Sequence, residues 1–212
     1  GMGNVGIANA EVKNVFHNPA FAGLRESHQE VSYVEWLPNL TDDMGYQSIL
    51  ITSDMGWSSE IFYFNYGTQV QSDQYGVVLG DFESSSYRVS GGYGFGYKDW
   101  LVGARLNLYS HNFIDDYSID MNYGFDIGAY KEFGNTSLGL VLKDVGGETE
   151  FLSQKLNLPM SVGVGVGHKF GNFTLASDVK FYEDYNSIGL GGQYDLGIAS
   201  LKLGYYTESE FD

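Results

Sequence analysis

The feature that most constrains the fold is an alternation of two kinds of residue along the chain. From about residue 30 onward, bulky apolar side chains recur at every second position, and the positions between them are mostly glycine, serine or isolated charges. In residues 87–97, one parity holds Tyr87, Val89, Tyr93, Phe95 and Tyr97, and the other holds Arg88, Ser90, Gly92, Gly94 and Gly96. Similar alternation occurs in residues 100–108, 117–128, 162–167 and 173–181. Because successive side chains of a strand point to opposite faces, this period of two predicts an all-β fold.

The chemistry of the two faces indicates whether the folded protein is surrounded by water or by membrane lipid. A water-soluble sandwich or barrel places its apolar side chains inside and coats its exterior with polar ones, but here the second face is mostly glycine. A transmembrane barrel has the inverse arrangement, with large apolar residues facing lipid and small or charged residues facing the lumen. Many of the expected strands also have about the 9–11 residues that a tilted strand needs to cross a bilayer. The pattern predicts an antiparallel up-and-down transmembrane β-barrel, with a soluble β-sandwich or adhesin as the alternative that folds without detergent.

Composition removes several other classes of protein. The chain carries 27 Asp and Glu against 11 Lys and Arg, a formal charge of -16, so clustered cations for nucleic-acid phosphates are not expected and nucleic acid is an unsuitable partner. It has no cysteine, which excludes disulfides, thiolate metal sites and thiol nucleophiles. No window approaches the roughly 18 apolar residues of a membrane-spanning helix.

Turn signals divide the chain into strands joined by alternating short and long connections. Short turns are expected at Met55-Gly56, Lys98-Asp99, Gly134-Asn135, Gly171-Asn172 and Gly197-Ile198. Longer connections are expected over 38–45, 67–84, 111–116, 145–158 and 183–186. The resulting eleven strands cover 30–37, 46–54, 59–67, 86–97, 100–111, 117–132, 136–145, 159–170, 173–182 and 187–206, the last range being divided in two by the turn at Gly197. Residues 76–83 fit either a further strand or part of the long connection that precedes residue 86.

The odd number of strands bears on the completeness of the barrel. Bacterial barrels of this class use an even number of strands, with short periplasmic turns and long external loops. If residue 30 enters from the periplasm, the strand over 200–206 runs outward and no strand returns. We therefore expect a barrel that is incomplete at its C-terminal end, or one whose open edge is closed by something else.

The N-terminal residues carry a resemblance to a known family. Residues 1–10, with glycine at positions 1, 3 and 6, are followed by Val15-Phe16-His17-Asn18-Pro19-Ala20. This order resembles the mature N-terminus of PorV/PorQ proteins, which belong with the FadL-like outer-membrane barrels. Further similar stretches are Tyr66-Gly67, Leu79-Gly80-Asp81-Phe82, Leu140 to Gly146, Leu158-Pro159, Gly191 to Tyr194 and Leu201 to Tyr205, so the resemblance extends along essentially the whole chain.

The resemblance implies both an architecture and a function. It implies a fourteen-stranded barrel, of which about eleven strands are present, with residues 1–29 forming a plug segment in the lumen and residues 30–212 forming the barrel. It implies the outer membrane of a Gram-negative, Bacteroidetes-type bacterium and an accessory or docking role in type IX protein secretion. The expected partners are membrane lipid, secretion-system components and exported proteins. The alternative is a FadL-like channel for hydrophobic small molecules.

Two sets of residues are candidate sites within this barrel. Proline fixes its own φ and asparagine can bond to nearby backbone, so Asn18, Pro19 and Ala20 are expected to fix the geometry of the plug. Pairing two strands about Asp115-Asp116 places Arg105 opposite Asp126, and a turn at Gly134-Asn135 places Asp126 opposite Lys143. The register therefore predicts a lumen charge cluster of one carboxylate between two cations, with a structural role favoured over a transport path.

No residue pattern indicates catalysis, a metal or a cofactor. Gly1, Gly3 and Gly6 have the G-x-G-x-x-G spacing, but no βαβ unit surrounds them. The four histidines, His17, His28, His111 and His168, lack ligand spacing. The acidic pairs Asp42-Asp43, Asp115-Asp116 and Glu183-Asp184 fit exposed turns better than calcium sites. We expect no catalytic residues, because a nucleophile, a base and an orienting residue cannot be assembled.

Overall fold

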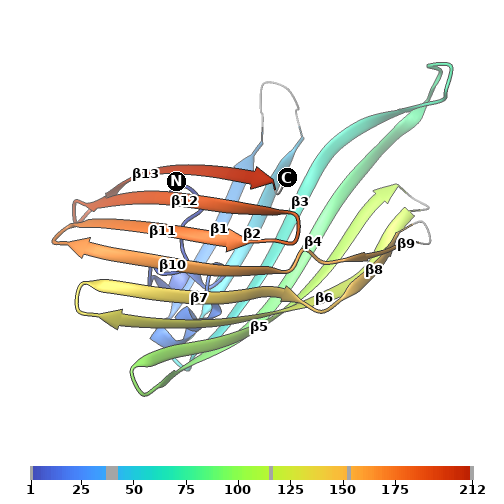
Figure 1. The fold of residues 1–212 in the computed structure, drawn as a ribbon. Helices are drawn as coiled ribbons and strands as arrows, with labels where there is room; N and C mark the ends of the chain where they lie inside the picture. Colours follow the sequence, from blue (N-terminus) through green and yellow to red (C-terminus); the bar gives the residue numbers. More distant parts are fainter. Residues whose placement is uncertain (1, 37–42, 115–116, 152–153, 211–212) are drawn as a thin grey trace.

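The computed structural model describes residues 2–36, 43–114, 117–151 and 154–210, which form one large antiparallel sheet and an N-terminal segment packed against it (Figure 1). The strands are β1 (His28–Glu35), β2 (Gly45–Thr52), β3 (Trp57–Ser72), β4 (Val78–Tyr97), β5 (Trp100–Ile114), β6 (Tyr117–Phe133), β7 (Thr136–Val145), β8 (Glu148–Phe151), β9 (Gln154–Asn157), β10 (Ser161–Phe170), β11 (Phe173–Phe181), β12 (Tyr185–Asp195) and β13 (Ser200–Glu210).

Eleven of these strands pair with their neighbours in chain order. The order is β1 to β7 and then β10 to β13, while β8 and β9 form a separate two-stranded sheet within the β7–β10 connection. Strands β1 and β13 are the two edges, and within the described residues the sheet is not closed. The predicted all-β, antiparallel, up-and-down sheet is confirmed. Barrel closure, a total of fourteen strands and insertion into a membrane stay predictions.

The tight turns lie where turn chemistry places them. Tyr97 faces Trp100, Phe133 faces Thr136, and Phe170 faces Phe173 across three two-residue turns. The first residue of each turn has a positive φ, of 53° at Lys98, 64° at Gly134 and 61° at Gly171. Such φ values match the twist of the flanking strands. Glycine reaches this conformation without a steric penalty, and Lys98 is the exception among the three.

The connection expected over 67–84 is mostly strand, which corrects that prediction. Strand β3 continues to Ser72 and β4 begins at Val78, so residues 78–83 open the same strand that was expected over 86–97. The actual turn is held by Asp73, whose Oδ1 accepts hydrogen bonds from the amides of Tyr75 (2.8 Å) and Val77 (2.9 Å). Gly67, which was expected to end a strand, instead lies in a bulge with φ 79°.

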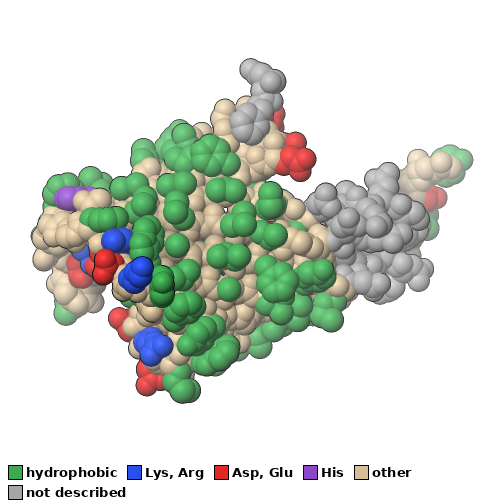
Figure 2. All heavy atoms as spheres, turned by 60° about the horizontal axis from the view of Figure 1, so that its bottom comes forward, with side chains coloured by type: hydrophobic (Ala, Val, Ile, Leu, Met, Phe, Trp, Pro, Cys, Tyr) green, Lys and Arg blue, Asp and Glu red, His purple; other side chains and the backbone are tan. Residues whose placement is uncertain are grey.

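The two faces of the sheet differ as the alternation predicts. On the outer face, bulky apolar side chains are exposed in strand after strand: Ile49, Ile61, Val89, Phe95, Leu106, Phe125, Ile127, Leu140, Val162, Leu175, Ile188 and Leu190. Figure 2 shows one side of this face, where hydrophobic side chains cover much of the surface. The inner face buries polar residues instead: Ser58, Glu60, Ser90, Arg105, Asn107, Asn122, Asp126, Asp178, Lys180 and Ser187.

The N-terminal segment, residues 2–27, covers the inner face from one side of the sheet to the other. It contains two 3-10 helices, η1 (Val12–Asn14) and η2 (Pro19–Leu24), and Figure 1 shows the sheet curling around it. A Cβ atom added to a glycine of the sheet would meet this segment at many points: Gly204 and Gly191 near residues 2–3, Gly139 and Gly165 near Ile7, Gly128 near Asn18, Gly103 near Pro19, and Gly94 near Gly23. The glycines of the inner face therefore allow a second layer of backbone to lie directly on the sheet.

The main hydrophobic core lies between this segment and the sheet. Phe21 and Ala20 are fully buried, and Val15 is almost fully buried. The Phe21 ring packs edge-on against Tyr130 of β6, with ring centroids 5.2 Å apart. Burial of a large aromatic side chain contributes about 1.5–3 kcal/mol, so this core anchors the segment to the sheet.

Candidate functional site

The Asn18-Pro19-Ala20 motif fixes the N-terminal segment on β5 and β6. Asn18 is the N-cap of η2, and its Oδ1 accepts a hydrogen bond from the Ala20 amide at 3.0 Å. Its Nδ2 donates to the carbonyl oxygens of Ile7 (2.9 Å) and Ala129 (3.2 Å). Pro19 occupies the first helical position, where the missing N–H has no intrahelical partner to lose. One buried side chain thus joins a helix cap, an earlier part of the segment and the sheet.

A second anchor holds residues 4–8 on the other half of the sheet. The Oδ2 atom of Asp178, on β11, accepts hydrogen bonds from the amides of Gly6 (2.7 Å) and Ile7 (3.0 Å). Lys180 Nζ donates to the Asn4 carbonyl at 3.0 Å, and Ser137 Oγ donates to the Ala8 carbonyl at 2.8 Å. A buried carboxylate and a buried ammonium thereby provide hydrogen-bond partners for backbone amides and a carbonyl of a segment that has little regular structure.

Asp178 and Lys180 were not among the expected site residues. The sequence signal was present, because both lie on the polar parity of a strand whose other parity is apolar. What the sequence could not supply was the partner, since the contacts join residues more than 170 positions apart.

His17 lies between the motif and this second anchor. A Cβ atom at Gly6 would overlap the His17 ring, so the absence of a side chain at Gly6 makes room for the imidazole. Burial, together with the positive charges of Lys180 and Lys143, lowers the pKa of His17 to about 3. The imidazole is therefore neutral at physiological pH.

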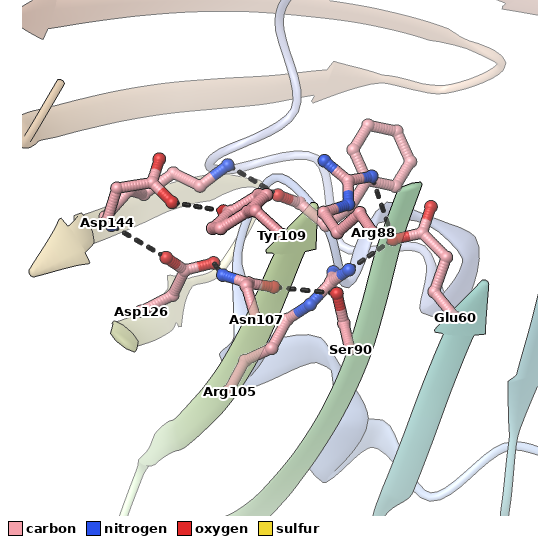
Figure 3. A network of polar contacts seen from close by, with 10 residues as sticks. Glu60, Arg88, Ser90, Arg105, Asn107, Tyr109, Asp126 and Asp144 are labelled. Carbon is pink, nitrogen blue, oxygen red and sulfur yellow. Dashed lines mark hydrogen bonds and ion pairs between the residues drawn. The ribbon is translucent and has the colours of Figure 1, made fainter. Parts of the chain in front are cut away.

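A network of charged and polar side chains crosses the inner face from β3 to β7 (Figure 3). Glu60 on β3 forms ion pairs with Arg88 (3.0 Å) on β4 and with Arg105 on β5. Asn107 accepts a hydrogen bond from Ser90 at 2.8 Å and donates one to Asp126 at 3.0 Å. The network ends at Asp144, whose amide donates to Asp126 at 2.9 Å and whose carboxylate accepts from the Tyr109 hydroxyl.

The structure places Arg105 directly opposite Asp126 on β5 and β6, which is the register that the sequence predicts. The second half of the predicted cluster differs. The β6–β7 ladder shifts register between Phe125 and Ile127, so the predicted pairing of Asp126 with Lys143 is interrupted, and Lys143 Nζ donates to the Phe16 carbonyl at 2.9 Å. The ion-pair partner of Arg105 is Glu60. The arrangement is therefore not one carboxylate between two cations but three acids and three bases spread over five strands.

The remaining candidates are dispersed. His111 contacts Ser86 Oγ at 2.7 Å and His168 contacts Thr136 Oγ1 at 2.8 Å, far from each other in the sheet order. Gly3 and Gly6 belong to the N-terminal segment, whereas Gly1, Asp42 and the Asp115-Asp116 pair lie outside the described residues. Within the described part of the chain, no three His, Cys, Asp or Glu side chains are grouped as metal ligands. No described helix is long and apolar enough to span a bilayer.

Taken as a whole, the site is a polar, glycine-lined inner face that binds the chain's own N-terminal segment. Its side chains donate to and accept from backbone groups of that segment or pair with one another. Comparison with models of known protein families and with curated proteins found no match to this chain.

Proposed function

We propose that this protein is a non-enzymatic outer-membrane β-barrel that acts as an accessory or docking component of type IX protein secretion. The observation that carries the membrane part of the proposal is the contrast between the two faces of the sheet. The outer face exposes Ile, Leu, Val, Phe and Tyr in strand after strand, whereas the inner face buries charges. This inversion matches a lipid-facing exterior and a polar interior.

The packing of the N-terminal segment favours docking over conduction. Ile7, Asn18, Ala20 and Phe21 are fully buried between the segment and the sheet, and Asn18 and Asp178 hold the segment by hydrogen bonds. A filled inner face suits a scaffold that presents its exterior to an exported protein. The link to type IX secretion in particular rests on the resemblance to PorV/PorQ proteins.

One observation favours the alternative of a channel for hydrophobic small molecules. An apolar groove of about 610 Å³ runs across β10 to β13 and is lined by Val166, Leu175, Leu190 and Leu203. These side chains belong to the exposed outer face, so the groove opens toward the surroundings of the sheet. A transport function would additionally need a route from this groove past the buried N-terminal segment.

The membrane assignment is tested by fractionating the bacterium that encodes the protein. We expect the protein in the outer-membrane fraction, with a gel mobility in detergent that changes on heating, as for a folded barrel. Recovery as a soluble monomer in buffer would overturn the membrane assignment and the secretion role together.

The secretion role is tested by deleting the gene and measuring the proteins that the strain exports. We expect exported proteins to accumulate inside the cell and the intact gene to restore their release. Normal export combined with impaired uptake of hydrophobic compounds would replace the docking function with the channel. A deletion strain in which both export and uptake are normal would reject both functions.

A further inference from the structure

A small cavity lies at the rim of the sheet, next to two of its tight turns. It is lined by residues 98–101 at the β4–β5 turn, by residues 130–132 just before the β6–β7 turn, and by Leu24 of the N-terminal segment. Both turns lie on the left side of Figure 1, at the end of the sheet with the short turns, called the short-turn end here. The cavity, called the rim cavity, has a volume of about 320 Å³, within the range of roughly 300–1,000 Å³ for small-ligand pockets.

Two cations and two acids line the rim cavity. The cations are Lys98 and Lys131, and the acids are Asp99 and Glu132. Lys131 Nζ lies 3.5 Å from Asp99 Oδ2, but the Asp99 side chain is 82% exposed, so this pair is solvated and opens at little cost. Lys98 takes part in none of the ion pairs that the described residues form. Both lysines can therefore pair with an anionic ligand.

The charges are divided between the two faces of the sheet. Lys131 has the parity of the outer face, and it is the one charged residue of that parity between Met121 and Phe133. Glu132 has the parity of the inner face, where its Oε1 accepts a hydrogen bond from the Tyr130 hydroxyl at 2.6 Å. A positive and a negative group thus lie on opposite sides of the rim, an arrangement that complements a ligand with both charges.

Aromatic side chains of the outer face lie next to the two lysines. Lys131 Nζ is 5.6 Å from the centroid of the Trp100 ring and 5.0 Å from that of Phe133, and Lys98 Nζ is 5.4 Å from the centroid of the Tyr97 ring. Tyr97 and Phe133 are more than half exposed. Trp and Tyr are enriched where a membrane meets water, and lysine there extends its ammonium toward the headgroups. With the outer face in lipid, as proposed, the rim cavity lies at the level of the headgroups.

We propose that the rim cavity binds the headgroup of a zwitterionic phospholipid that carries a phosphate and a primary ammonium. The phosphate would pair with Lys98 and Lys131, and the ammonium would pair with Asp99 and Glu132. Hydrogen bonds between charged groups are stronger than those between neutral ones. The acyl chains would lie along the apolar outer face next to Tyr97. The inference rests on the membrane part of the proposed function, to which it adds a specific lipid site.

Native mass spectrometry tests the proposal. The protein is released from detergent micelles that contain equal amounts of phosphatidylethanolamine and phosphatidylglycerol with the same acyl chains. Both lipids have a phosphate, but only phosphatidylethanolamine has an ammonium group. We expect its adducts to exceed those of phosphatidylglycerol about threefold, the effect of one partly exposed pair of charges. Equal adducts of the two lipids would overturn the proposal.

Free phosphoethanolamine distinguishes a lipid from a soluble phosphate compound as the occupant. An excess of it is not expected to displace the bound lipid, because the acyl chains contribute to binding of the lipid alone. Complete displacement would overturn the assignment of the rim cavity to a lipid.

Charge variants separate the two halves of the headgroup. The variant Asp99→Asn/Glu132→Gln is expected to lose the preference for phosphatidylethanolamine and to retain the two lipids equally. The variant Lys98→Gln/Lys131→Gln is expected to retain about threefold less of either lipid, because the phosphate is common to both. Heat-dependent gel mobility shows that each variant folds, and the two variants are independent tests.

Matched controls remove the same charges elsewhere at the short-turn end. They are Asp54→Asn/Asp195→Asn and Lys169→Gln/Lys202→Gln, whose residues do not line the rim cavity. Both controls are expected to bind lipid as the parent does. Equal effects of the cavity variants and their controls would show general attraction to charge and would overturn the proposal.

Failure of the inference and failure of the proposed function give different results. A protein that behaves as a folded outer-membrane barrel but shows no lipid preference would reject the inference and leave the proposed function standing. Normal export in the deletion strain would reject the secretion role alone, because the lipid site depends only on the membrane assignment. Recovery as a soluble monomer in buffer would reject both.

Discussion

The side-chain oxygen of Asn18 occupies the space that a Cβ atom at Gly128 would fill. The same side chain bonds to Ala20, Ile7 and Ala129, so it cannot swing away without breaking the contacts that fix the N-terminal segment. The strand residue and the segment residue therefore require each other: the segment needs a glycine at position 128, and that glycine leaves a gap unless Asn18 fills it.

Gly128→Ala is expected to destabilise the protein by about 1–3 kcal/mol, because the added methyl group overpacks a site that has no free space. The quantity measured is the free energy of unfolding in detergent. Its readout is the loss of the folded, faster-migrating gel band as the urea concentration increases. Gly91→Ala is the matched control. A Cβ atom at Gly91, in β4, meets nothing within 4 Å, so this variant should unfold like the parent. Equal behaviour of the two variants would mean that the segment does not pack against β6.

Asn18→Ala is expected to cost about 2–3 kcal/mol. Loss of the N-cap accounts for about 1 kcal/mol, and the Ile7 and Ala129 carbonyls, which lose a buried donor, account for the rest. Without the Asn18 side chain, the N-terminal segment should also become accessible to added protease before the sheet unfolds. Limited proteolysis, with detection of fragments that have lost the N-terminal segment, would show this. Lys98→Ala, in an exposed turn, tests for general effects of mutation and should leave the cleavage pattern unchanged.

Much of the sheet could be predicted from the sequence because its signals are local. The alternation of residues such as Tyr93 and Gly94 assigned the two faces. The turns at Lys98-Asp99 and Gly134-Asn135 set the pairing of β4 with β5 and of β6 with β7, and pairing about Asp115-Asp116 predicted the position of Arg105 opposite Asp126. A two-residue period together with a tight turn leaves little freedom in the register of an antiparallel pair.

The parts that sequence reasoning missed depend on irregularities and on distant partners. The register shift beside Asp126 moved Lys143 away from the predicted pairing, and one such shift changes every contact beyond it. Glu60 and Asp178 carry the expected polar parity, but their partners lie on other strands or on the N-terminal segment. The turn at Asp73 was missed because it is not a two-residue turn. It extends over residues 73–77 and combines hydrogen bonds to the Asp73 carboxylate with backbone bonds from Gly76 to Asp73 and from Asp73 to Val77.

His17 gives a pH dependence whose sign follows from its pKa. The folded protein has a pKa of about 3 at this residue, against about 6.5 in an unfolded chain. The unfolded state therefore binds a proton at a higher pH than the folded state, and the contribution to stability is lost as the pH falls from about 6.5 toward 3. The free energy of unfolding falls by at most about 1.4 kcal/mol per pH unit through this residue.

The test compares the parent with His17→Gln between pH 7.5 and pH 4.5. Carboxylates titrate in both proteins, so the informative quantity is the difference between their unfolding free energies. We expect this difference to shift in favour of the glutamine variant as the pH falls. A difference that stays constant over this range would show that His17 titrates alike in the folded and unfolded protein.

Glu60 is the charge on which the inner-face network depends most, because its carboxylate pairs with two guanidinium groups. Glu60→Gln leaves Arg88 and Arg105 without that charge. Arg105 is almost completely buried, so removal of its partner is expected to cost about 3 kcal/mol.

Arg88 is more exposed. The variant Arg88→Met removes one cation while the pair between Glu60 and Arg105 stays intact, so a loss of about 1 kcal/mol is expected. Urea unfolding of Glu60→Gln, of Arg105→Met and of the double variant Glu60→Gln/Arg105→Met measures the coupling between the two residues, and the same measurement is made on Arg88→Met. The double variant should be more stable than Glu60→Gln, because it no longer buries an unpaired charge. A double variant that is less stable than Glu60→Gln would show that Arg105 stabilises the sheet through contacts other than its pair with Glu60.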